Sequence, residues 1–438
     1  MALQQVPSPA RRGPARVHRA WWVAAVAFVA LVASAGFRAT PGVLILPLQD
    51  EFGWSTATVS LAVSVNLMLF GLTAPFAAAL MESFGMRRVV AAALCVVAAG
   101  SGLTVFMTAS WQLVLCWGVL VGLGTGSMAL VFAATVANRW FTRSRGLVTG
   151  ILTAGSATGQ LVFLPLVAWL AEGAGWRVAA LVVAGAALAV VPLVLLLLAD
   201  RPADVGLEPY GGADPSAPAP APSGGAARAA VLALRRASHV PAFWLLVAGF
   251  AICGASTNGL IATHFVPAAH DHGMGTTTAA GLLALVGVFD VVGTIASGWL
   301  TDRVDSRVLL AWYYALRGLS LFALPFLFAA VPHATMLLFI VFYGLDWVAT
   351  VPPTVALCRE RFGADGGIVF GWVFASHQVG AALAASAAGL VRTTTGSYDL
   401  AWIGAGALCL VAAGLSLSVR ARRTVAESPG ATTAAMSD

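Results

Sequence analysis

Long apolar segments follow one another along almost the whole chain, and they constrain its fold more than any other feature. Each has about the 20 residues that a helix needs to cross a bilayer. Within lipid, only a helix of that length satisfies its own backbone hydrogen bonds. The sequence therefore predicts an all-α membrane protein with twelve transmembrane helices, at residues 21–47, 58–80, 88–107, 112–137, 146–170, 177–199, 242–267, 278–300, 308–330, 334–356, 367–390 and 398–419.

The composition excludes several other classes of protein. Charged residues make up 10% of the 438 residues, whereas a soluble domain carries about 25%. The five cysteines are scattered, without a C-x-x-C pair, so neither a metal site nor a disulfide is expected. No phosphate-binding loop of the form G-x-x-x-x-G-K-[ST] occurs, and the chain has no lysine at all. We therefore expect no enzyme activity, no ATP-driven pumping and no cofactor.

The 24 arginines predict how the chain is oriented in the membrane. With both termini in the cytoplasm, 20 of the 24 fall in cytoplasmic segments. Arg177 and Arg392 fall outside, while Arg38 and Arg317 lie within spans. This asymmetry is the one that the positive-inside rule requires, so we expect a multi-pass protein of the inner (cytoplasmic) membrane. The net charge of +6 lies in short loops and therefore does not indicate nucleic-acid binding.

Changes of composition divide the chain into five parts. Residues 1–20 are expected to form a cytoplasmic tail, and the arginines before residue 21 lead into a first helix that is retained rather than cleaved as a signal peptide. Residues 21–199 and 241–420 form two six-helix bundles. The Pro-, Ala-, Gly- and Ser-rich segment 200–240 predicts a flexible cytoplasmic linker. Residues 421–438 form a second cytoplasmic tail, expected to be disordered after Arg423.

The two halves of the chain repeat each other. At an offset of 220 residues, four positions match in residue type: Pro47 with Pro267, Gly53 with Gly273, Arg87 with Arg307 and Arg139 with Arg359. At an offset of 221, "GLVTGILTAGSATG" (146–159) aligns with "GIVFGWVFASHQVG" (367–380). Two parallel repeats predict a pseudo-two-fold axis along the membrane normal, with a substrate path between the halves near the midplane.

A charged turn after the eighth apolar segment connects the chain to a known family. "GWLTDRVDSR" (298–307) resembles the signature turn of the major facilitator superfamily, and "AALMESFGMRR" (78–88) is a degenerate copy in the first half. The resemblance covers essentially the whole chain. It implies two six-helix bundles, and it implies a conformational latch between them formed by Glu82, Arg87, Asp302, Arg303 and Arg307.

Three further stretches resemble the branch of monocarboxylate porters and oxalate/formate antiporters. They are "GFRATPGVLILPLQDEFGWS" (36–55), "NRWFTRSRGLVTGI" (138–151) and "RPADVGLEPYG" (201–211). The resemblance implies transport of small organic anions, with a proton or in exchange. In that branch a cation often stands where Arg38 stands, an acid where Asp290 stands, and an arginine four residues later. Here Thr294 occupies that later position.

Ionisable side chains within the spans are candidates for proton coupling, because a charge near the bilayer centre costs about 2.5–3.5 kcal/mol. Asp290, Arg317 and Asp346 belong to this group. Asp290 either changes its charge during the transport cycle or forms a fixed ion pair. Arg317 is the expected partner of Asp290, although a purely structural pair is the stronger reading. Asp346 either shares the proton role or pairs with Arg317.

A second group of polar residues is predicted to bind substrate. Its members are Arg38, Asn66, Gln160, Asn258, His377 and Gln378. For Arg38 the alternative is an extended side chain that reaches the outer surface. For the amides and the histidine it is helix packing. His264, near the outer end of the seventh helix, either takes part in gating or lies at the membrane interface.

These observations predict a secondary active transporter that moves a small organic anion by alternating access, proton-coupled or exchanging. The expected partners are that anion, protons and the lipid bilayer, with the protein as a monomer. The alternative is a proton-driven exporter of drugs or other amphipathic compounds. A transport-inactive sensor is a third class, but the linker carries no folded signalling domain. Arg38→Ala separates the first two, since only the anion porter depends on that cation.

Overall fold

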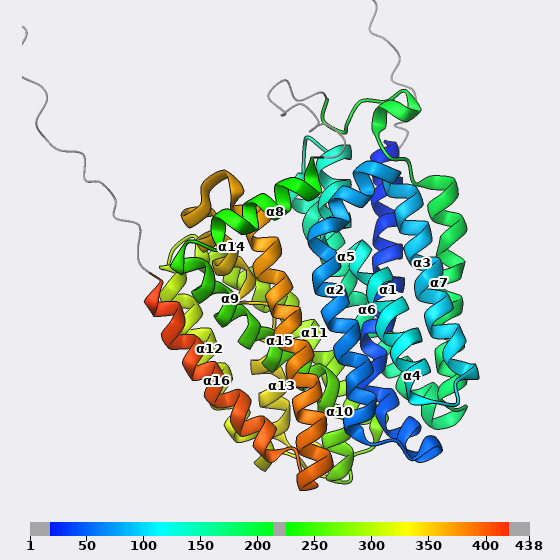
Figure 1. Ribbon diagram of the computed structural model, residues 1–438, viewed down its shortest axis with the longest axis vertical. Coiled ribbons are helices and arrows are strands. Elements are labelled where there is room, and N and C mark those ends of the chain that lie inside the picture. Colours follow the sequence, from blue (N-terminus) through cyan, green and yellow to red (C-terminus); the bar gives the residue numbers. More distant parts are fainter. Residues whose placement is uncertain (1–17, 213–224, 420–438) are drawn as a thin grey trace, which may run out of the picture.

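The computed structural model describes residues 18–212 and 225–419, leaving out the side chains of residues 37–41, 78, 129–130, 145–146, 153, 156–157, 226 and 364. Almost all of the described residues are helical, and no strand occurs among them. One isolated bridge pairs Phe141 with Tyr210. Figure 1 shows long helical segments, here called rods, standing roughly side by side in two groups.

Twelve rods of membrane length run through the described residues, and three of them are composite. The first six are α1 (Arg19–Phe52), α2 (Thr56–Phe84), α3 (Met86–Leu103), α4–η2–α5 (Ser110–Leu113, Val114–Val121, Gly122–Trp140), α6 (Arg145–Gly173) and α7 (Trp176–Leu197). The last six are α9–η4–α10 (Pro241–Gly254, Ala255–Ile261, Ala262–Asp271), α11 (Thr276–Thr301), α12 (Ser306–Ala323), α13–α14 (Ala334–Asp346, Val351–Phe362), α15 (Gly366–Thr395) and α16 (Asp399–Ser418). A shorter helix, α8 (Ala226–Ala237), lies between the two sets.

Eleven of these rods are both long and apolar enough to cross a membrane, judged over the described residues. The remaining rod is α6, which coincides with the predicted helix at 146–170. The predicted fold class, an all-α membrane protein of twelve spans, is confirmed.

Glycines at equivalent places in the two halves make the internal repeat visible in the backbone. Gly53 ends α1 with φ 66°, and Gly273, 220 residues later, follows α10 with φ 84°. Gly175 and Gly396 form a second pair, 221 residues apart, with φ 90° and 76°. A positive φ favours glycine at all four positions, although Gly175, with ψ 153°, and Gly396, with ψ −1°, adopt different conformations. The predicted pseudo-symmetry of the two bundles is borne out.

Three of the rods depart from regular α-helix. The residues of η2 and η4 form π-helices within the fourth and seventh rods. The tenth rod is interrupted at 347–350, just before Pro352 and Pro353. Each proline lacks the N–H that would continue the preceding helix, so α14 starts afresh there.

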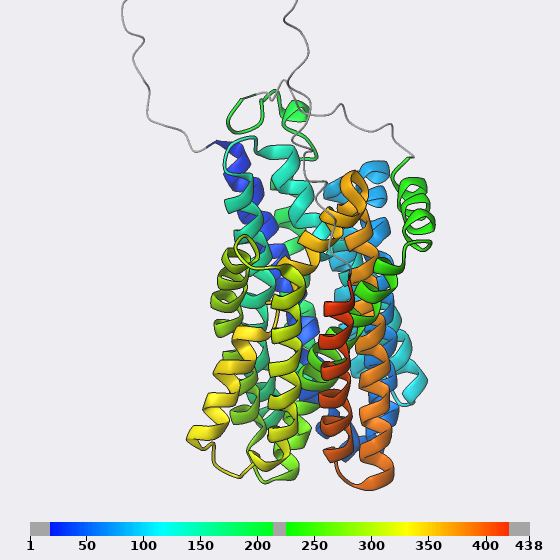
Figure 2. The same cartoon turned by 90° about the vertical axis from the view of Figure 1, so that its left-hand side faces the viewer.

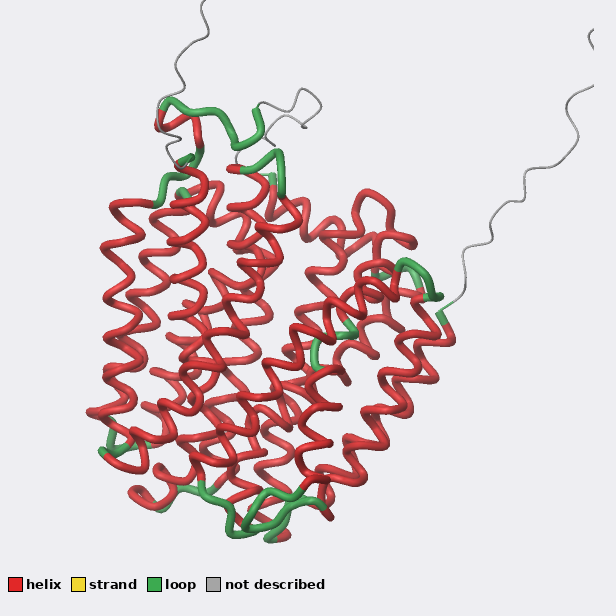
Figure 3. The backbone as a smooth tube through the Cα atoms, turned by 180° about the vertical axis from the view of Figure 1, so that it is seen from behind, coloured by secondary structure: helices red, strands yellow, loops and turns green. Residues whose placement is uncertain are grey.

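The two bundles lean apart toward the end that carries the linker, here named the linker end, and converge at the opposite, distal end (Figures 1 and 3). Three pairs of rods join the bundles: α2 with α15, α6 with α11, and α1 with α10. Small residues let them approach. A Cβ added at Gly71 would lie 2.5 Å from the Cβ of Gln378, and one at Gly389 would lie 2.5 Å from Ser60 Oγ. The α2–α15 contact therefore leaves no room for larger side chains.

Hydrogen bonds tie the bundles together nearer the distal end. Ser64 Oγ donates to the carbonyl of Ala382 at 2.6 Å and lies 2.7 Å from Ser386 Oγ. Closer to that end, the backbone N–H of Ala57 donates to Thr393 Oγ1 at 3.2 Å. These contacts close the molecule on the side away from the linker.

Two parts of the linker differ from the expectation of a flexible segment. After α7 the chain folds back on the end of α5, where Tyr210 donates its N–H to Trp140 O at 2.8 Å and accepts from Thr142 N at 3.0 Å. Farther on, α8 packs against α2 and α15. Its buried residues are alanines. Because the whole linker is rich in alanine, its composition did not distinguish this helix from unstructured sequence. Residues 1–17, 213–224 and 420–438, including the predicted tails, lie outside the described residues.

Candidate functional site

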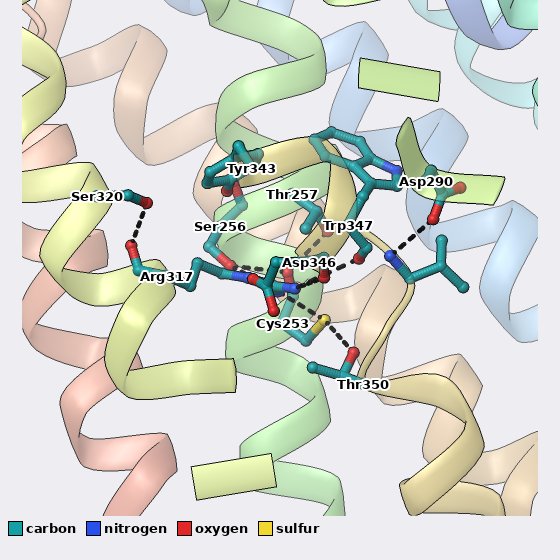
Figure 4. A network of polar contacts seen from close by, with 11 residues as sticks. Cys253, Ser256, Thr257, Asp290, Arg317, Ser320, Tyr343, Asp346, Trp347 and Thr350 are labelled. Atoms are coloured by element: carbon teal, nitrogen blue, oxygen red, sulfur yellow. Dashed lines mark hydrogen bonds and ion pairs between the residues drawn. The ribbon is translucent and has the colours of Figure 1, made fainter. Parts of the chain in front are cut away.

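The break in the tenth rod frees backbone groups that must find other partners inside the membrane. Arg317 on α12 supplies donors for two of them. Its Nη2 donates to the carbonyl of Asp346 at 2.6 Å and to that of Trp347 at 3.3 Å, while its Nε donates to Asp346 Oδ2 at 2.5 Å. Figure 4 shows this network. Arg317 therefore caps the end of α13 and neutralises its last side chain at once.

The Arg317–Asp346 pair is sealed from solvent. The Arg317 side chain is 0% exposed and that of Asp346 is 7% exposed. Nη1 of Arg317 also lies 3.0 Å from Cys253 Sγ on α9, so three rods of the second bundle meet at this guanidinium. A buried, multiply bonded pair of this kind fixes helices to one another.

Asp290 on α11 binds the other side of the same break. Its Oδ1 accepts from the backbone N–H of Val348 at 3.1 Å and from Thr294 Oγ1 at 3.0 Å. Arg317 is thus paired with Asp346, and the expected Asp290–Arg317 pair is not formed. Among the described residues, no side-chain cation bonds to Asp290, and its Oδ2 receives no hydrogen bond. The carboxyl group is half-buried.

A small pocket lies between the bundles, close to Asp290 along α11. Its walls come from α6 of the first bundle and from α10, α11 and the broken tenth rod of the second. Its cavity volume is about 20 Å³, and it is lined by Gln160, Leu164, Ala262, Leu283, Val286, Gly287 and Trp347. Gly287 precedes Asp290 by less than one helical turn, and Trp347 is joined to Val348, whose N–H holds Asp290. The pocket therefore borders both bundles and the break.

Close packing of α11 against α13 holds this geometry. A Cβ added at Gly293 would lie 1.8 Å from the carbonyl oxygen of Leu345, and one at Gly344 would lie 2.7 Å from Phe289 Cβ. Both distances exclude any larger residue without a shift of the helices. The two glycines therefore bring Asp290 within reach of the break.

The predicted amides divide between the pocket and helix packing. Gln160 lines the pocket. Asn66 on α2 instead donates from Nδ2 to the carbonyl of Trp117 at 2.8 Å, which satisfies a backbone group of the π-helix η2. Asn258 lies in the other π-helix, η4, where Tyr343 Oη donates to the carbonyl of Ser256 at 2.9 Å. Asn258 is half-buried, and no hydrogen bond of its side chain is recorded among the described residues.

His377 and Gln378 lie in the packed α15 interfaces rather than in the pocket. The His377 ring is stacked 5.9 Å from the ring of Phe374 and lies 4.9 Å from that of Phe250. Gln378 is 0% exposed and faces Gly71 of α2. Neither Nε2 nor Oε1 of Gln378 has a hydrogen-bond partner among the described residues. Its amide is thus buried where the two bundles meet.

Of the residues predicted to form a latch, the three arginines make contacts within their own halves of the chain. Arg87 donates its backbone N–H to Asp200 Oδ1 at 2.7 Å, and Arg303 lies over the ring of Trp299 at 4.1 Å. Arg307 pairs with Asp305 at 2.5 Å. Asp302 ends α11, and Glu82 Oε2 is buried without a hydrogen-bond partner in the described part of the chain. No ion pair between the bundles is recorded among these residues.

His264 takes part in a contact near the distal end that the sequence left open. Its Nε2 lies 2.9 Å from the carbonyl of Ala385 and its Nδ1 lies 3.3 Å from Tyr398 Oη. Sequence reasoning did not single out Tyr398, Cys253 or Tyr343. Tyrosines within or beside apolar segments were the available signal, because a buried hydroxyl requires a partner. The side chain of Arg38 lies outside the described residues.

The model of the Major Facilitator Superfamily matches residues 26–385. The chain is 27% identical to the uncharacterized MFS-type transporter YcxA of Bacillus subtilis (strain 168), over 90% of this chain and 93% of that protein. It is 29% identical to monocarboxylate transporter 13 of Rattus norvegicus, covering 91% and 88%, and 29% identical to monocarboxylate transporter 11 of Mus musculus, covering 91% and 86%.

The solved structures that resemble the chain share its fold. The crystal structure of a bacterial homolog of the human lysosomal transporter Spinster, inward-facing and unoccupied, matches with a TM-score of 0.71 at 17% identity, over 92% of this chain and 97% of that chain. The inward-facing, occupied form of the same protein matches with a TM-score of 0.72 at 15% identity, over 93% and 97%. At these identities the likeness concerns the arrangement of helices alone.

Proposed function

The chain belongs to the Major Facilitator Superfamily, and on that premise we propose that it moves a small organic anion across the membrane by alternating access, coupled to a proton or to exchange. It is a multi-pass transporter, and its relatives include monocarboxylate transporters. The proposal extends their printed substrate class to this chain and assigns the chemistry to residues of the second bundle.

The observation that carries the proposal is the position of Asp290. This carboxyl group lies beside the pocket between the bundles and has no cation bonded to it among the described residues. Its hydrogen bonds come from neutral donors, which tolerate both protonation states. A carboxyl group locked to an arginine would stay charged throughout the cycle, whereas Asp290 can change its charge when its surroundings dry out or fill with water.

Arg317 and Asp346 then act as positioning residues. They hold the end of α13 at the break, and the break presents the N–H of Val348 to Asp290. The substrate's negative charge requires a cation of its own. Arg38 on α1 is the proposed one, with Gln160 and Asn258 as polar contacts in the two halves. Gln378 contributes at the α2–α15 interface, and His377 at the α9–α15 contact, when the bundles rock.

The arrangement of the bundles supports a state open toward the linker end. There the rods lean apart (Figure 1), and Arg87 and Arg307 bond within their own halves. We place this end in the cytoplasm of a cytoplasmic-membrane protein, since it carries most of the arginines. The division into bundles 21–199 and 241–420, the closing of the latch in the opposite state and the monomeric form are parts of the same proposal.

Ligand-induced stabilisation tests the substrate class. The purified full-length protein is heated with short monocarboxylates at pH 5.5 and 7.5, and each acid is matched by its neutral amide. A ligand that binds the folded state raises the unfolding midpoint by mass action. We expect at least one carboxylate to raise it and its amide not to. Arg38→Ala should abolish the shift, whereas equal shifts from acids and amides would reject the anion site.

An exporter of amphipathic compounds is the second candidate. It is favoured by the apolar walls of the pocket, where Leu164, Leu283 and Val286 outnumber the polar groups. Such a transporter would need Asp290 but no substrate-binding arginine. Arg38→Ala would then leave efflux of a hydrophobic cation unchanged, while Asp290→Asn would abolish it.

A further inference from the structure

Helix α8 carries one outward face made of basic and apolar residues. Its members are three or four residues apart and so share one side of the helix. All are exposed, and the apolar pair at the centre is 51% and 39% exposed. The face consists of Arg228, Val231, Leu232, Arg235 and Arg236, and α8 contains no acidic residue.

The opposite side of α8 fixes which way this face points. Ala230, Ala233 and Ala237 are buried against the bundles. The carbonyl of Ala230 also accepts a hydrogen bond from Trp372 Nε1 of α15 at 2.9 Å. Because α8 also contacts α2, it touches both bundles with its alanine side. Its basic face must therefore point away from the protein.

The helix lies at the level where the membrane-spanning rods end. In Figure 2 it stands on the outer flank of the molecule, at the linker end. Trp244, just inside the following rod, is 56% exposed and donates from Nε1 to the carbonyl of Ser238 at 2.8 Å. A tryptophan with an exposed ring and a satisfied N–H is typical of the boundary between lipid and water. This boundary is also the depth of the lipid headgroups.

The arginines of α8 have unused binding capacity. Arg236 pairs with Asp365 at 2.8 Å in an exposed contact. Arg228 and Arg235 have no ion pair in the described part of the chain. A guanidinium presents a planar fork that fits phosphate oxygens, and neighbouring apolar side chains can enter the acyl boundary. Two free cations flanking Val231 and Leu232 thus match a lipid that has both a phosphate and fatty chains.

We propose that this face of α8 binds the headgroups of anionic phospholipids. Arg228 and Arg235 contact the phosphates, and Val231 and Leu232 enter the lipid. Each basic side chain near an anionic membrane surface strengthens binding about fivefold. Since α8 contacts both α2 and α15, a bound lipid would stabilise the relative position of the bundles seen here. This role lies beyond substrate transport and does not depend on the identity of the substrate.

The test measures thermal unfolding of the full-length protein in dodecyl maltoside. Phosphatidylglycerol, phosphatidylcholine or inorganic phosphate is added in increasing amounts. We expect phosphatidylglycerol alone to raise the unfolding midpoint in a saturable manner. Arg228→Gln/Arg235→Gln should weaken its affinity about 25-fold, as two lost cations require, whereas Arg228→Lys/Arg235→Lys should retain most of it.

A matched control has the same loss of charge elsewhere at the linker end. Arg88 and Arg201 are exposed and lie outside α8, so Arg88→Gln/Arg201→Gln should keep the wild-type response. The proposal is overturned if the α8 double glutamine variant binds phosphatidylglycerol as the wild type does, or if the control loses as much affinity. An equal effect of inorganic phosphate would also overturn it, because the site would then hold a free anion rather than a lipid.

Discussion

Loss of Arg317 should strongly destabilise the second bundle. In Arg317→Met, the Asp346 carboxylate remains buried without its counter-charge, and the carbonyls of Asp346 and Trp347 lose their donor. Removing one partner of a buried ion pair costs about 3–5 kcal/mol. Asp346→Leu should cost a similar amount, because the guanidinium, 0% exposed, is then left unpaired.

The double variant separates the charge from the rest of the network. Arg317→Met/Asp346→Leu buries no charge and leaves only carbonyl oxygens unpaired, at about 1–3 kcal/mol. It should therefore be more stable than either single variant. The assay is the free energy of unfolding in mixed micelles of detergent and dodecyl sulfate. Ser320→Ala, one turn farther on α12, is the control. Single variants as stable as wild type, or a double variant whose loss equals their sum, would refute the assignment of a coupled pair.

Three smaller predictions follow from contacts outside this pair. Ser64→Ala removes bonds between the bundles at 2.6 and 2.7 Å and should lower stability by about 1–2 kcal/mol in the same unfolding assay. Asn66→Ala leaves the carbonyl of Trp117 unpaired and should cost about 1–3 kcal/mol, with Asn66→Asp unable to restore the donor. Hydrogen bonds from Arg177 hold the pKa of Glu51, beyond the first span, below its usual 4.5. The stabilisation by the ionised Glu51 carboxylate is therefore complete above pH 4.5 and is lost as the pH falls through the lowered pKa. Thermal unfolding of Glu51→Gln should lack this acid dependence.

The sequence predicted the fold because the membrane permits few alternatives. Long apolar segments must be helices in lipid, and the repeated turn glycines, Gly53 and Gly273, marked the two halves. It did not predict the π-helices η2 and η4. Their apolar pattern differs little from that of an α-helix, and their cost is recovered by distant side chains such as Asn66 and Tyr343.

The sequence predicted which ionisable residues belong to the site but not which of them pair with each other. Asp290, Arg317 and Asp346 stood out because charges in apolar segments are rare. Which acid holds the arginine depends on the break before Pro352, which releases the carbonyls of Asp346 and Trp347 toward Arg317. That geometry lies in the packing of three helices and has no local signature. The lipid-facing side of α8 was likewise hidden, since alanines in a Pro- and Gly-rich linker suggested no helix.

Proton-driven accumulation tests the central claim most directly. The protein is reconstituted in liposomes, and uptake of a radiolabelled monocarboxylate that passes the thermal-shift test is followed with and without a pH gradient. Exchange of the same compound at equal concentrations on both sides is measured in parallel. We predict that the wild type accumulates the acid with the gradient, and that Asp290→Asn exchanges it but no longer accumulates it. Full accumulation by Asp290→Asn would contradict the account.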